Sequence, residues 1–286
     1  MENSLLNFKQ VNESIDKTKK TLSISALVTM LQDKFDSQGV ATKTHEKHYN
    51  DPDSQYYHMS VDEILDAWDN KASESRRYGC MLDDYIGFNL TKDITGLELW
   101  KLDNNYEWDE RLKGVCDSFD SFYSLTQQSG DTEFVAREVT VYYRVPNTDY
   151  YIKGRFDALF RNKKTNKWIV IDWKSSGTID KVPNKYTNKM YGPANAYPQL
   201  NWYVYTIQTH FYKKALLESG YLPEGTTEDD ITVMIVQLPG RILENGKNYA
   251  IHKEAFPYNT EFLDRLFSFG VQKNKIMSTY AKASNG

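Results

Sequence analysis

Residues 154–176, GRFDALFRNKKTNKWIVIDWKSS, place a short apolar run on either side of the polar segment RNKKTNK. Both runs are rich in β-branched and aromatic residues, so the stretch predicts a β-hairpin. With the turn centred on the polar segment, Asp157 falls opposite Asp172. Side chains alternate between the two faces of a strand, so Asp172 and Lys174 point the same way. The hairpin therefore brings two carboxylates and one ammonium group together on one face of a sheet.

The second strand of this hairpin is apolar on both sides of its aspartate. The run WIVIDWK around Asp172 is typical of a central strand that is covered on both faces. A carboxylate in such a strand needs a partner charge or a metal ion, because burying it alone is costly. We therefore expect a divalent cation beside a phosphate here. The alternative is that Asp172 and Lys174 form the solvated face of a half-buried hairpin.

The pattern G-x-x-D, an intervening turn and an apolar run that ends in D-x-K-S resembles the core of the PD-(D/E)XK nuclease superfamily. The sequence of this motif is most similar to the RecB-like and phage exonuclease branches of the superfamily. The resemblance implies an α/β or α+β fold with a restriction-endonuclease-like core, in which helices flank a central mixed sheet. It makes Asp157, Asp172 and the main-chain carbonyl of Trp173 metal ligands, and Lys174 the residue that orients the attacking water. Ser175 and Ser176 would then contact the substrate.

A helix with the pattern Q-x-x-x-Y is the next motif of that family. The segment YPQLNWYVYTIQTHFYKKAL supplies Gln199 and Tyr203 at this spacing, and Pro198 suits the first turn of a helix. The expected apolar stripe of this helix comprises Leu200, Val204, Ile207 and Phe211. The resemblance implies a catalytic role for Gln199 and a substrate contact for Tyr203. A helix-surface amide is the alternative for Gln199.

An additional acidic site residue, which would assist the two aspartates in holding the metal, is expected upstream of the hairpin. Glu138 directly precedes the strand-like run VTVYYRV and is preferred over Glu133, which lies further from it. Related phage enzymes also carry a helix whose histidine or glutamate approaches the metal. The matching segment here, AWDNKASESRRYGCMLDDYIGF, has Asp83 at the histidine position and Gly87 at the glutamate position. Asp83 is thus a candidate oxygen ligand, with an exposed helix carboxylate as the alternative.

Basic residues gather in places where a nucleic-acid backbone could pass, although the net charge of the chain is −4. Segment 178–198 has no periodicity and contains Pro, Gly and Asn, so it predicts a long loop between the catalytic strand and the glutamine helix. Its lysines alternate with tyrosines, which suits phosphate contact and base stacking. The candidate substrate-binding cations are Arg76, Arg77, Lys181, Lys185 and Lys189. A solvated loop is the alternative.

Composition excludes several classes of protein. Charged residues make up 26% and hydrophobic residues 40% of the 286 residues, as in a folded globular protein. Two cysteines, Cys80 and Cys116, cannot hold the four-cysteine iron–sulfur cluster of some RecB-like relatives. The sequence has no phosphate-binding loop of an ATPase. It also has no apolar run of transmembrane length and no signal peptide, so we expect a cytoplasmic protein that avoids membranes, in a bacterium or a phage-infected cell.

The chain is expected to have a mostly helical region, 1–130, followed by the nuclease core, 131–286. Residues 1–20 and 36–58 are expected to lack regular structure, and a capping box at Ser60 and Glu63 should open a helix. The expected helices are 23–35, 61–70, 73–90, 107–128, one from Pro198, and 260–280. Strands are expected over 135–175, 231–239 and 247–256.

These features favour a Mg²⁺-dependent DNA exonuclease that acts in recombination, repair or phage DNA processing, with Mn²⁺ able to replace Mg²⁺. Two alternatives stay open: a structure-specific endonuclease or junction resolvase, and an inactive DNA-binding module on the same fold. The expected partner is single- or double-stranded DNA. A single-strand annealing or recombination protein and further copies of the chain are additional candidate partners.

Overall fold

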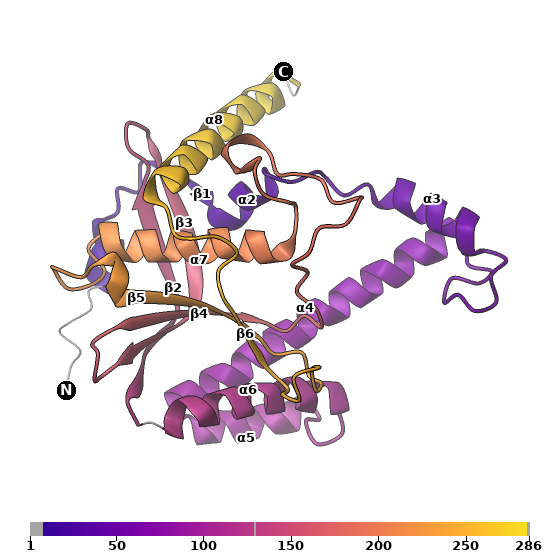
Figure 1. The fold of residues 1–286 in the computed structure, drawn as a ribbon, viewed down its shortest axis with the longest axis horizontal. Helices are drawn as coiled ribbons and strands as arrows, with labels where there is room; N and C mark the ends of the chain where they lie inside the picture. Colours follow the sequence, from indigo (N-terminus) through magenta and orange to yellow (C-terminus); the bar gives the residue numbers. More distant parts are fainter. Residues whose placement is uncertain (1–7, 129, 285–286) are drawn as a thin grey trace. The chain divides into compact units, whose positions relative to one another are not determined.

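The computed structural model describes residues 8–128 and 130–284 (Figure 1). By its internal contacts the chain forms two compact units: Met1–Gln32 with Lys113–Gly286, and Asp33–Leu112. The first unit holds the sheet, and the second is helical. The expected domain boundary after residue 130 stays a prediction, since compactness alone does not define a folding domain.

The first unit is built on a six-stranded mixed sheet with the order β1-β3-β4-β5-β6, in which β2 also pairs with β3. The β1–β3 and β4–β5 pairs are parallel, and the other pairs are antiparallel. The strands are β1 (Lys20–Ser23), β2 (Thr132–Arg144), β3 (Tyr150–Asn162), β4 (Trp168–Lys174), β5 (Ile231–Gln237) and β6 (Ala250–His252). The expected fold class, a mixed sheet flanked by helices, is confirmed.

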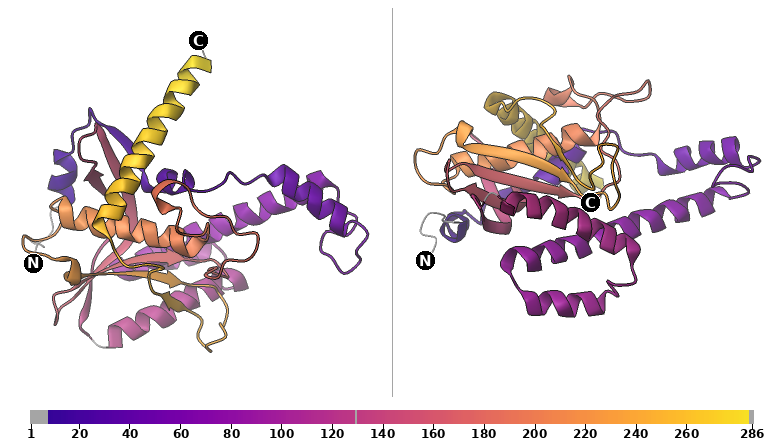
Figure 2. Two further views of the ribbon diagram at one scale, coloured as in Figure 1. Left: turned by 45° about the horizontal axis from the view of Figure 1, so that its top comes forward. Right: turned by 60° about the horizontal axis from the view of Figure 1, so that its bottom comes forward.

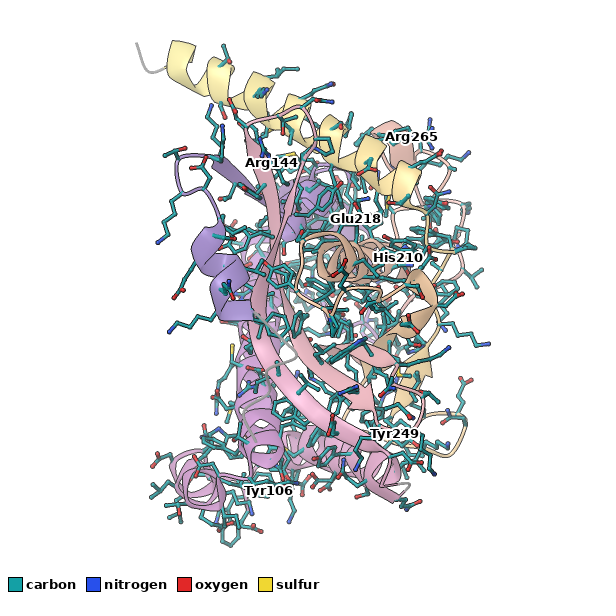
Figure 3. The ribbon with its side chains drawn as sticks, turned by 90° about the vertical axis from the view of Figure 1, so that its left-hand side faces the viewer. Tyr106, Arg144, His210, Glu218, Tyr249 and Arg265 are labelled. Atoms are coloured by element: carbon teal, nitrogen blue, oxygen red, sulfur yellow. The ribbon has the colours of Figure 1, made fainter. Side chains whose placement is uncertain are left out.

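Helices cover both faces of this sheet (Figures 1 and 2). Helix α7 (Asn201–Glu218) lies against one face, and Figure 3 shows the strands curving around it, with His210 and Glu218 labelled on α7. On the other face, Phe119 and Phe122 of α6 (Glu110–Gln128) meet the ring of Trp173 edge-on. Strand β4 is therefore central, as predicted.

The β3–β4 hairpin has the expected register over its turn-proximal half. The paired residues run from Arg161 and Trp168 to Ala158 and Ile171. One residue further, at Asp157, the ladder between the two strands stops. The hairpin therefore opens at the position of the two aspartates.

Strand β3 shares one of its edges between two partners. Because β2 pairs with both ends of β3, β1 and β4 must both lie on the opposite edge. There, β1 pairs with Tyr150–Lys153 and β4 pairs with Ala158–Arg161. Within the described part of the chain, no strand covers residues 154–157 on that edge. The carboxyl ends of β1 and β4 thus converge on this gap, which we call the fork (Ser23, residues 154–157 and Lys174).

Several sequence-based expectations for the elements are wrong. Residues 8–14 form α1 (Phe8–Ser14), whereas residues 1–7 lie outside the described part of the chain. The expected helix 23–35 is confirmed only over the short α2 (Ile24–Thr29), which directly follows β1, and the expected strand 247–256 is reduced to β6. The final helix α8 runs from Thr260 to Ser284, slightly beyond its expected end.

The second unit consists of α3 (Ser37–His48), α4 (Val61–Thr91) and α5 (Ile94–Asp103). Helix α3 was expected to be irregular because its sequence has little apolar periodicity; its N-cap is the Asp36 side chain, which accepts a hydrogen bond from the Gly39 amide. The capping box at Ser60 and Glu63 is confirmed, but the two expected helices form one continuous α4 because no Gly or Pro separates them.

Candidate active site

Three charged groups meet at the fork. Asp172 near the end of β4 is only 3% exposed, and its Oδ2 lies 2.7 Å from the Nζ atom of Lys174. Asp157 Oδ2 accepts a hydrogen bond of 2.6 Å from the main-chain amide of Trp173. This side-chain hydrogen bond takes the place of main-chain pairing between β3 and β4, which has stopped here. It fixes the Asp157 carboxylate beside the last residues of β4.

The electrostatics of the fork are those of a crowded anionic site. The pKa of Asp157 is raised above its usual range, first by burial and then by the negative charge of Asp172. Burial disfavours the charged form of Lys174, but Asp172 and Asp157 outweigh it and raise the pKa of that ammonium group. The cluster therefore carries two carboxylates against one cation.

Glu138 lies at the register position opposite Asp157 on β2. It is inside the strand rather than before it, and its φ of 53° places it in the left-handed region, which is uncommon for a residue other than glycine. Its Oε2 makes an ion pair of 2.8 Å with Arg155 Nε. The competing Glu133 pairs in register with Arg161, further along β3 from Asp157.

Two tyrosines of α7, which the sequence analysis did not identify, extend the site. The ring centroid of Tyr205 lies 4.5 Å from Lys174 Nζ, a cation–π distance. The pKa of Tyr212 is raised by burial and further by Asp172, Asp157 and Glu138. Helical periodicity could have placed both tyrosines near the sheet, but no spacing in the sequence pointed to the fork.

The glycine of the G-x-x-D motif has a steric role. A Cβ atom at Gly154 would lie 2.7 Å from a ring carbon of Phe211 and 2.9 Å from one of Tyr212. Only glycine lets α7 approach β3 this closely. The absence of a side chain at this position keeps Tyr212 within range of the carboxylates.

Gln199 lies outside the helix that it was expected to open. Its main-chain amide donates to the Asn188 carbonyl, and its side-chain amide donates 2.8 Å to the Lys189 carbonyl. Because Pro198 forms an isolated bridge with Lys189, α7 begins only at Asn201. The expectation of Pro198 in the first turn is therefore wrong, and Gln199 holds the preceding loop.

The rest of that helix follows the expected pattern in part. Val204, Ile207 and Phe211 are buried, as the stripe predicted. Leu200 is instead the N-cap residue, without a side-chain cap. The ring of Tyr203 stacks on that of Phe256, so its substrate contact stays a prediction.

The loop after β4 places its lysines near aromatic rings. Lys181 Nζ lies 4.9 Å from the ring centroid of Trp202, and Lys185 Nζ lies 4.9 Å from that of Tyr186, whose side chain is exposed. Lys189 belongs to the bridge with Pro198. Their substrate contacts stay predictions.

The serines after Lys174 are positioned by a residue that the sequence analysis did not identify. The Ser176 carbonyl accepts a hydrogen bond of 2.9 Å from Gln237 at the end of β5, next to Lys174 in register. Gln237 in turn lies 2.9 Å from His252 Nε2. Burial and then Lys181 lower the pKa of His252 to about 4, so this ring is neutral at pH 7. The predicted substrate contacts of Ser175 and Ser176 are untested.

Three predicted site residues belong to the helical unit. Asp83 lies on α4, and Arg76 on the same helix donates 2.8 Å to the Ser73 hydroxyl. The guanidinium of Arg77 lies 5.6 Å from the ring centroid of Tyr78. Each is described within its own unit, and its role at the metal or the substrate stays a prediction.

The fork fits a divalent cation. Among the described residues, no group of three or more His, Cys, Asp and Glu side chains is arranged to hold a metal. A cation would therefore be held by Asp157 and Asp172 with main-chain or water oxygens, which are the ligands Mg²⁺ prefers. Asp172 Oδ2 is buried, and its partner is the ammonium group of Lys174 at 2.7 Å. The expected contribution of the Trp173 carbonyl stays a prediction.

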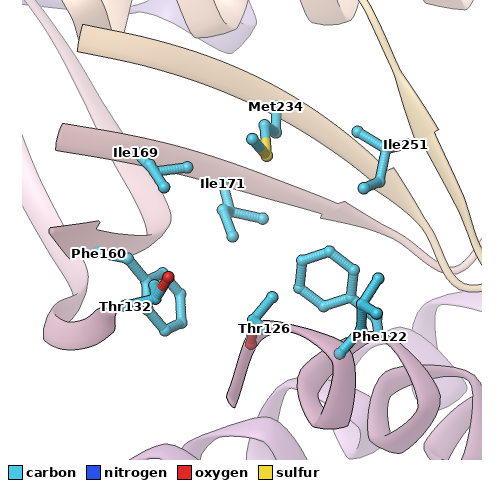
Figure 4. A pocket seen from close by; sticks show the side chains of 9 residues that line it. Phe122, Thr126, Thr132, Phe160, Ile169, Ile171, Met234 and Ile251 are labelled. Atoms are coloured by element: carbon cyan, nitrogen blue, oxygen red, sulfur yellow. The ribbon is translucent and has the colours of Figure 1, made fainter. Parts of the chain in front are cut away.

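The opposite face of the sheet offers no such chemistry. Between α6 and strands β3 to β6 lies an apolar cavity of about 240 Å³ (Figure 4). Its lining residues are Phe122, Leu125, Thr126, Thr132, Phe160, Ile169, Ile171, Met234 and Ile251, none of them charged.

Within the described residues, no helix combines the length and hydropathy needed to cross a membrane.

Comparison with known proteins identifies the family of the chain. No curated protein sequence matches the chain significantly. The crystal structure of SSO0001 is similar at 12% identity over 93% of this chain and 81% of that chain, with a TM-score of 0.35, too low to support an argument. The family model of the PD-(D/E)XK nuclease superfamily matches residues 43–267, which include the whole β3–β4 hairpin and α7. The chain belongs to the PD-(D/E)XK nuclease superfamily.

Proposed function

We propose that this protein is a Mg²⁺-dependent deoxyribonuclease that hydrolyses phosphodiester bonds at the fork. The observation that carries the proposal is the cluster of the buried Asp172 with the half-buried Asp157 and Lys174, in which two carboxyl groups lie beside a single cation. Family membership supports a nuclease that uses a divalent metal. Mn²⁺ has the same preference for oxygen ligands and would substitute.

Each residue of the cluster has a distinct part in this proposal. Asp157 and Asp172 would hold the cation, which supplies charge stabilisation at the phosphorus and a lowered pKa of the attacking water. Lys174, fixed by Asp172 and the Tyr205 ring, would orient that water and stabilise the charge that develops on the phosphoryl oxygens. Glu138 would hold Arg155 beside the scissile phosphate. Gln199 would act indirectly, through the loop that it anchors.

We propose an exonuclease of recombination, repair or phage DNA processing as the finer assignment. It rests on the similarity of the hairpin motif's sequence to those of RecB-like and phage exonucleases. A structure-specific endonuclease on the same site is the alternative. DNA would be the substrate in both cases.

The test is a gel assay with end-labelled linear DNA and covalently closed circular DNA, in Mg²⁺ and in EDTA. Wild-type protein is compared with K174A and with D149N, a matched control that removes an exposed carboxylate paired with Lys19. We expect Mg²⁺-dependent loss of the linear substrate, unchanged in D149N and absent in K174A. The labelled end then gives the polarity of digestion.

The remaining outcomes separate the alternatives. Cleavage of the circle would replace the exonuclease with an endonuclease. Cleavage that persists in K174A would contradict the assignment of the site. If neither substrate is cut in Mg²⁺ or Mn²⁺, the nuclease proposal fails and a DNA-binding module takes its place.

A further inference from the structure

A polar cleft of about 460 Å³ opens at the fork, on the side where β1 ends. Its walls come from the end of β1, the start of α2, β2, β3 and α7. The lining residues are Ser23, Ile24, Ser25, Thr140, Tyr142, Lys153, Gly154, Arg155 and Tyr212. None of them was singled out by the sequence analysis as a site residue.

The sheet register explains why these side chains gather. Lys153 pairs with Ser23 of β1 and with Tyr142 of β2, so the three residues form one row across the sheet. Arg155 pairs with Thr140 two rows further along, beyond the row of Gly154 and Val141. The main-chain positions of the two cations and of several hydroxyl-bearing residues are thereby fixed by the sheet, not by flexible loops.

The chemistry of the cleft suits an anion. None of the residues that line it is acidic, and Lys153 makes no ion pair with any described residue. Arg155 presents a guanidinium that Glu138 holds through one nitrogen, Nε. Hydroxyl groups and two cations form charge-assisted hydrogen bonds with phosphate oxygens.

The cleft adjoins the proposed catalytic centre, because Gly154 and Arg155 of the fork line it. Tyr212 lines the cleft, and its pKa is raised in part by Asp172 and Asp157, so the ring lies within electrostatic range of both. Arg155 lines the cleft as well, two residues before Asp157 on β3. An anion in the cleft would therefore be a neighbour of the phosphate held at the carboxylates.

We propose that this cleft is a second phosphate subsite, in which Lys153 and Arg155 bind a phosphate of the substrate strand next to the one that is cleaved. The inference rests on the proposed nuclease function. The bound group is either a terminal phosphomonoester or an internal phosphodiester. These two sources share the same recognition chemistry, and the experiment separates them.

The test compares K153Q with K167Q, which removes an exposed lysine from the hairpin turn far from the fork. Binding is measured by fluorescence anisotropy with metal-free protein in the D172N background. The probes are oligonucleotides of one sequence with a phosphate or a hydroxyl end, each titrated over a range of salt concentrations. We expect K153Q to weaken binding about tenfold, as for a lost charge-assisted hydrogen bond, and K167Q to leave it unchanged.

The salt dependence adds a readout that a folding defect would not give. Removing one phosphate contact should lower the slope of log affinity against log salt by about 0.7 for a single strand or 0.9 for a duplex. If K153Q weakens only the phosphate-ended probe, the cleft takes a terminal phosphate. If it weakens both probes equally, the cleft takes an internal phosphate.

Equal binding by K153Q and K167Q on every probe would overturn the subsite. Cleavage assays on the same variants without the D172N change keep the two proposals apart. If wild-type protein cuts no DNA but K153Q still weakens binding, the nuclease function fails, and the cleft is a phosphate site of a DNA-binding module. If wild-type protein cuts DNA and both lysine variants bind and cut alike, only the subsite fails.

Discussion

Two lysines of the first unit, Lys174 and Lys214, have the same kinds of partner but lie in different environments. Lys174 at the fork has Asp172 and Asp157 as its anionic neighbours and the ring of Tyr205 over its ammonium group. Lys214 on α7 has Glu218 at 2.7 Å, Asp264 at 3.2 Å and the ring of Tyr143 at 4.9 Å. Each cluster contains one cation and two carboxylates.

The two clusters differ in where the surplus negative charge lies. The side chains of Glu218 and Asp264 are 42% and 40% exposed, so water solvates the charge that Lys214 does not balance. The carboxylates there are also hydrogen-bonded by Thr260 and Tyr143. At the fork the Asp172 side chain is only 4% exposed and is paired with Lys174, while burial and Asp172 raise the pKa of the second carboxyl, Asp157, and favour its protonated form.

This difference separates a structural ion pair from a metal site. A solvated surplus charge needs no further partner, and such a network ties α7 to α8. A second buried carboxyl whose pKa is raised keeps its proton until a bound cation replaces it, so such a site favours a metal ion. The same residue types can thus stabilise a fold in one place and prepare it for a ligand in another.

The largest effect is expected from D172N. The cleavage rate should fall about a thousandfold or more. This loss exceeds the 10- to 100-fold loss typical for residues that only hydrogen-bond to a metal ligand. The unfolding free energy without metal should change by less than about 1 kcal/mol, because Lys174 keeps Asp157 as an anionic neighbour. Single-turnover cleavage and urea unfolding measure the two quantities, with D149N as the control. A D172N protein as active as wild type would contradict the site.

Adding Mg²⁺ tests the surplus charge directly. At a metal concentration one hundred times the dissociation constant, we expect the folded state to gain about 2.7 kcal/mol. The gain should vanish in D172N and persist in a K214M variant, because only the fork uses the ion. Thermal unfolding with and without Mg²⁺ measures it. A rise in midpoint that D172N shares with wild type would show that the metal binds elsewhere.

The hairpin and its chemistry could be predicted because they are local in sequence. The two apolar runs and the polar turn centred between them set the register that places Ala158 opposite Ile171, as observed. Glu138 was chosen for its place beside a strand; it lies between the pairs Arg137–Ala158 and Val139–Phe156, and its role at the site stays a prediction. These expectations needed only strand periodicity and spacing.

The fork itself could not be predicted, because it depends on pairing between distant segments. Strand β1 has four residues and joins β3 from more than a hundred residues away. Tyr205 and Tyr212 reach the site only because Gly154 lets α7 approach β3. Gln199 was misplaced because a long-range bridge between Lys189 and Pro198 delays the start of the helix.

The Lys214 cluster should respond in the opposite way to substitution. K214M removes the cation that Glu218, Asp264 and Thr260 share. Breaking a fully buried pair costs about 3–5 kcal/mol, and the partial exposure of both carboxylates should reduce the loss to about 2 kcal/mol. Urea unfolding measures it, and cleavage per folded molecule should be unchanged. A K214M protein as stable as wild type would show that the network is not structural.

The smallest effect concerns Tyr143, which donates its hydroxyl hydrogen to Asp264 at 2.9 Å. Burial, then this hydrogen bond and the charge of Asp264, raise the pKa of Tyr143 well above its usual value. The folded state therefore keeps the phenol proton at a pH where the unfolded chain loses it. The stability that this group contributes is present below pH 10 and declines as the pH rises above that value, by about 1.4 kcal/mol per pH unit.

Replacing Tyr143 with Phe should cost about 1 kcal/mol at pH 7, as for a lost hydrogen bond. Because the variant has no phenol to ionise, its deficit relative to wild type should shrink above pH 10. Denaturant unfolding of both proteins from pH 8 to 11 measures the difference, and a constant deficit would mean that Tyr143 ionises equally in both states.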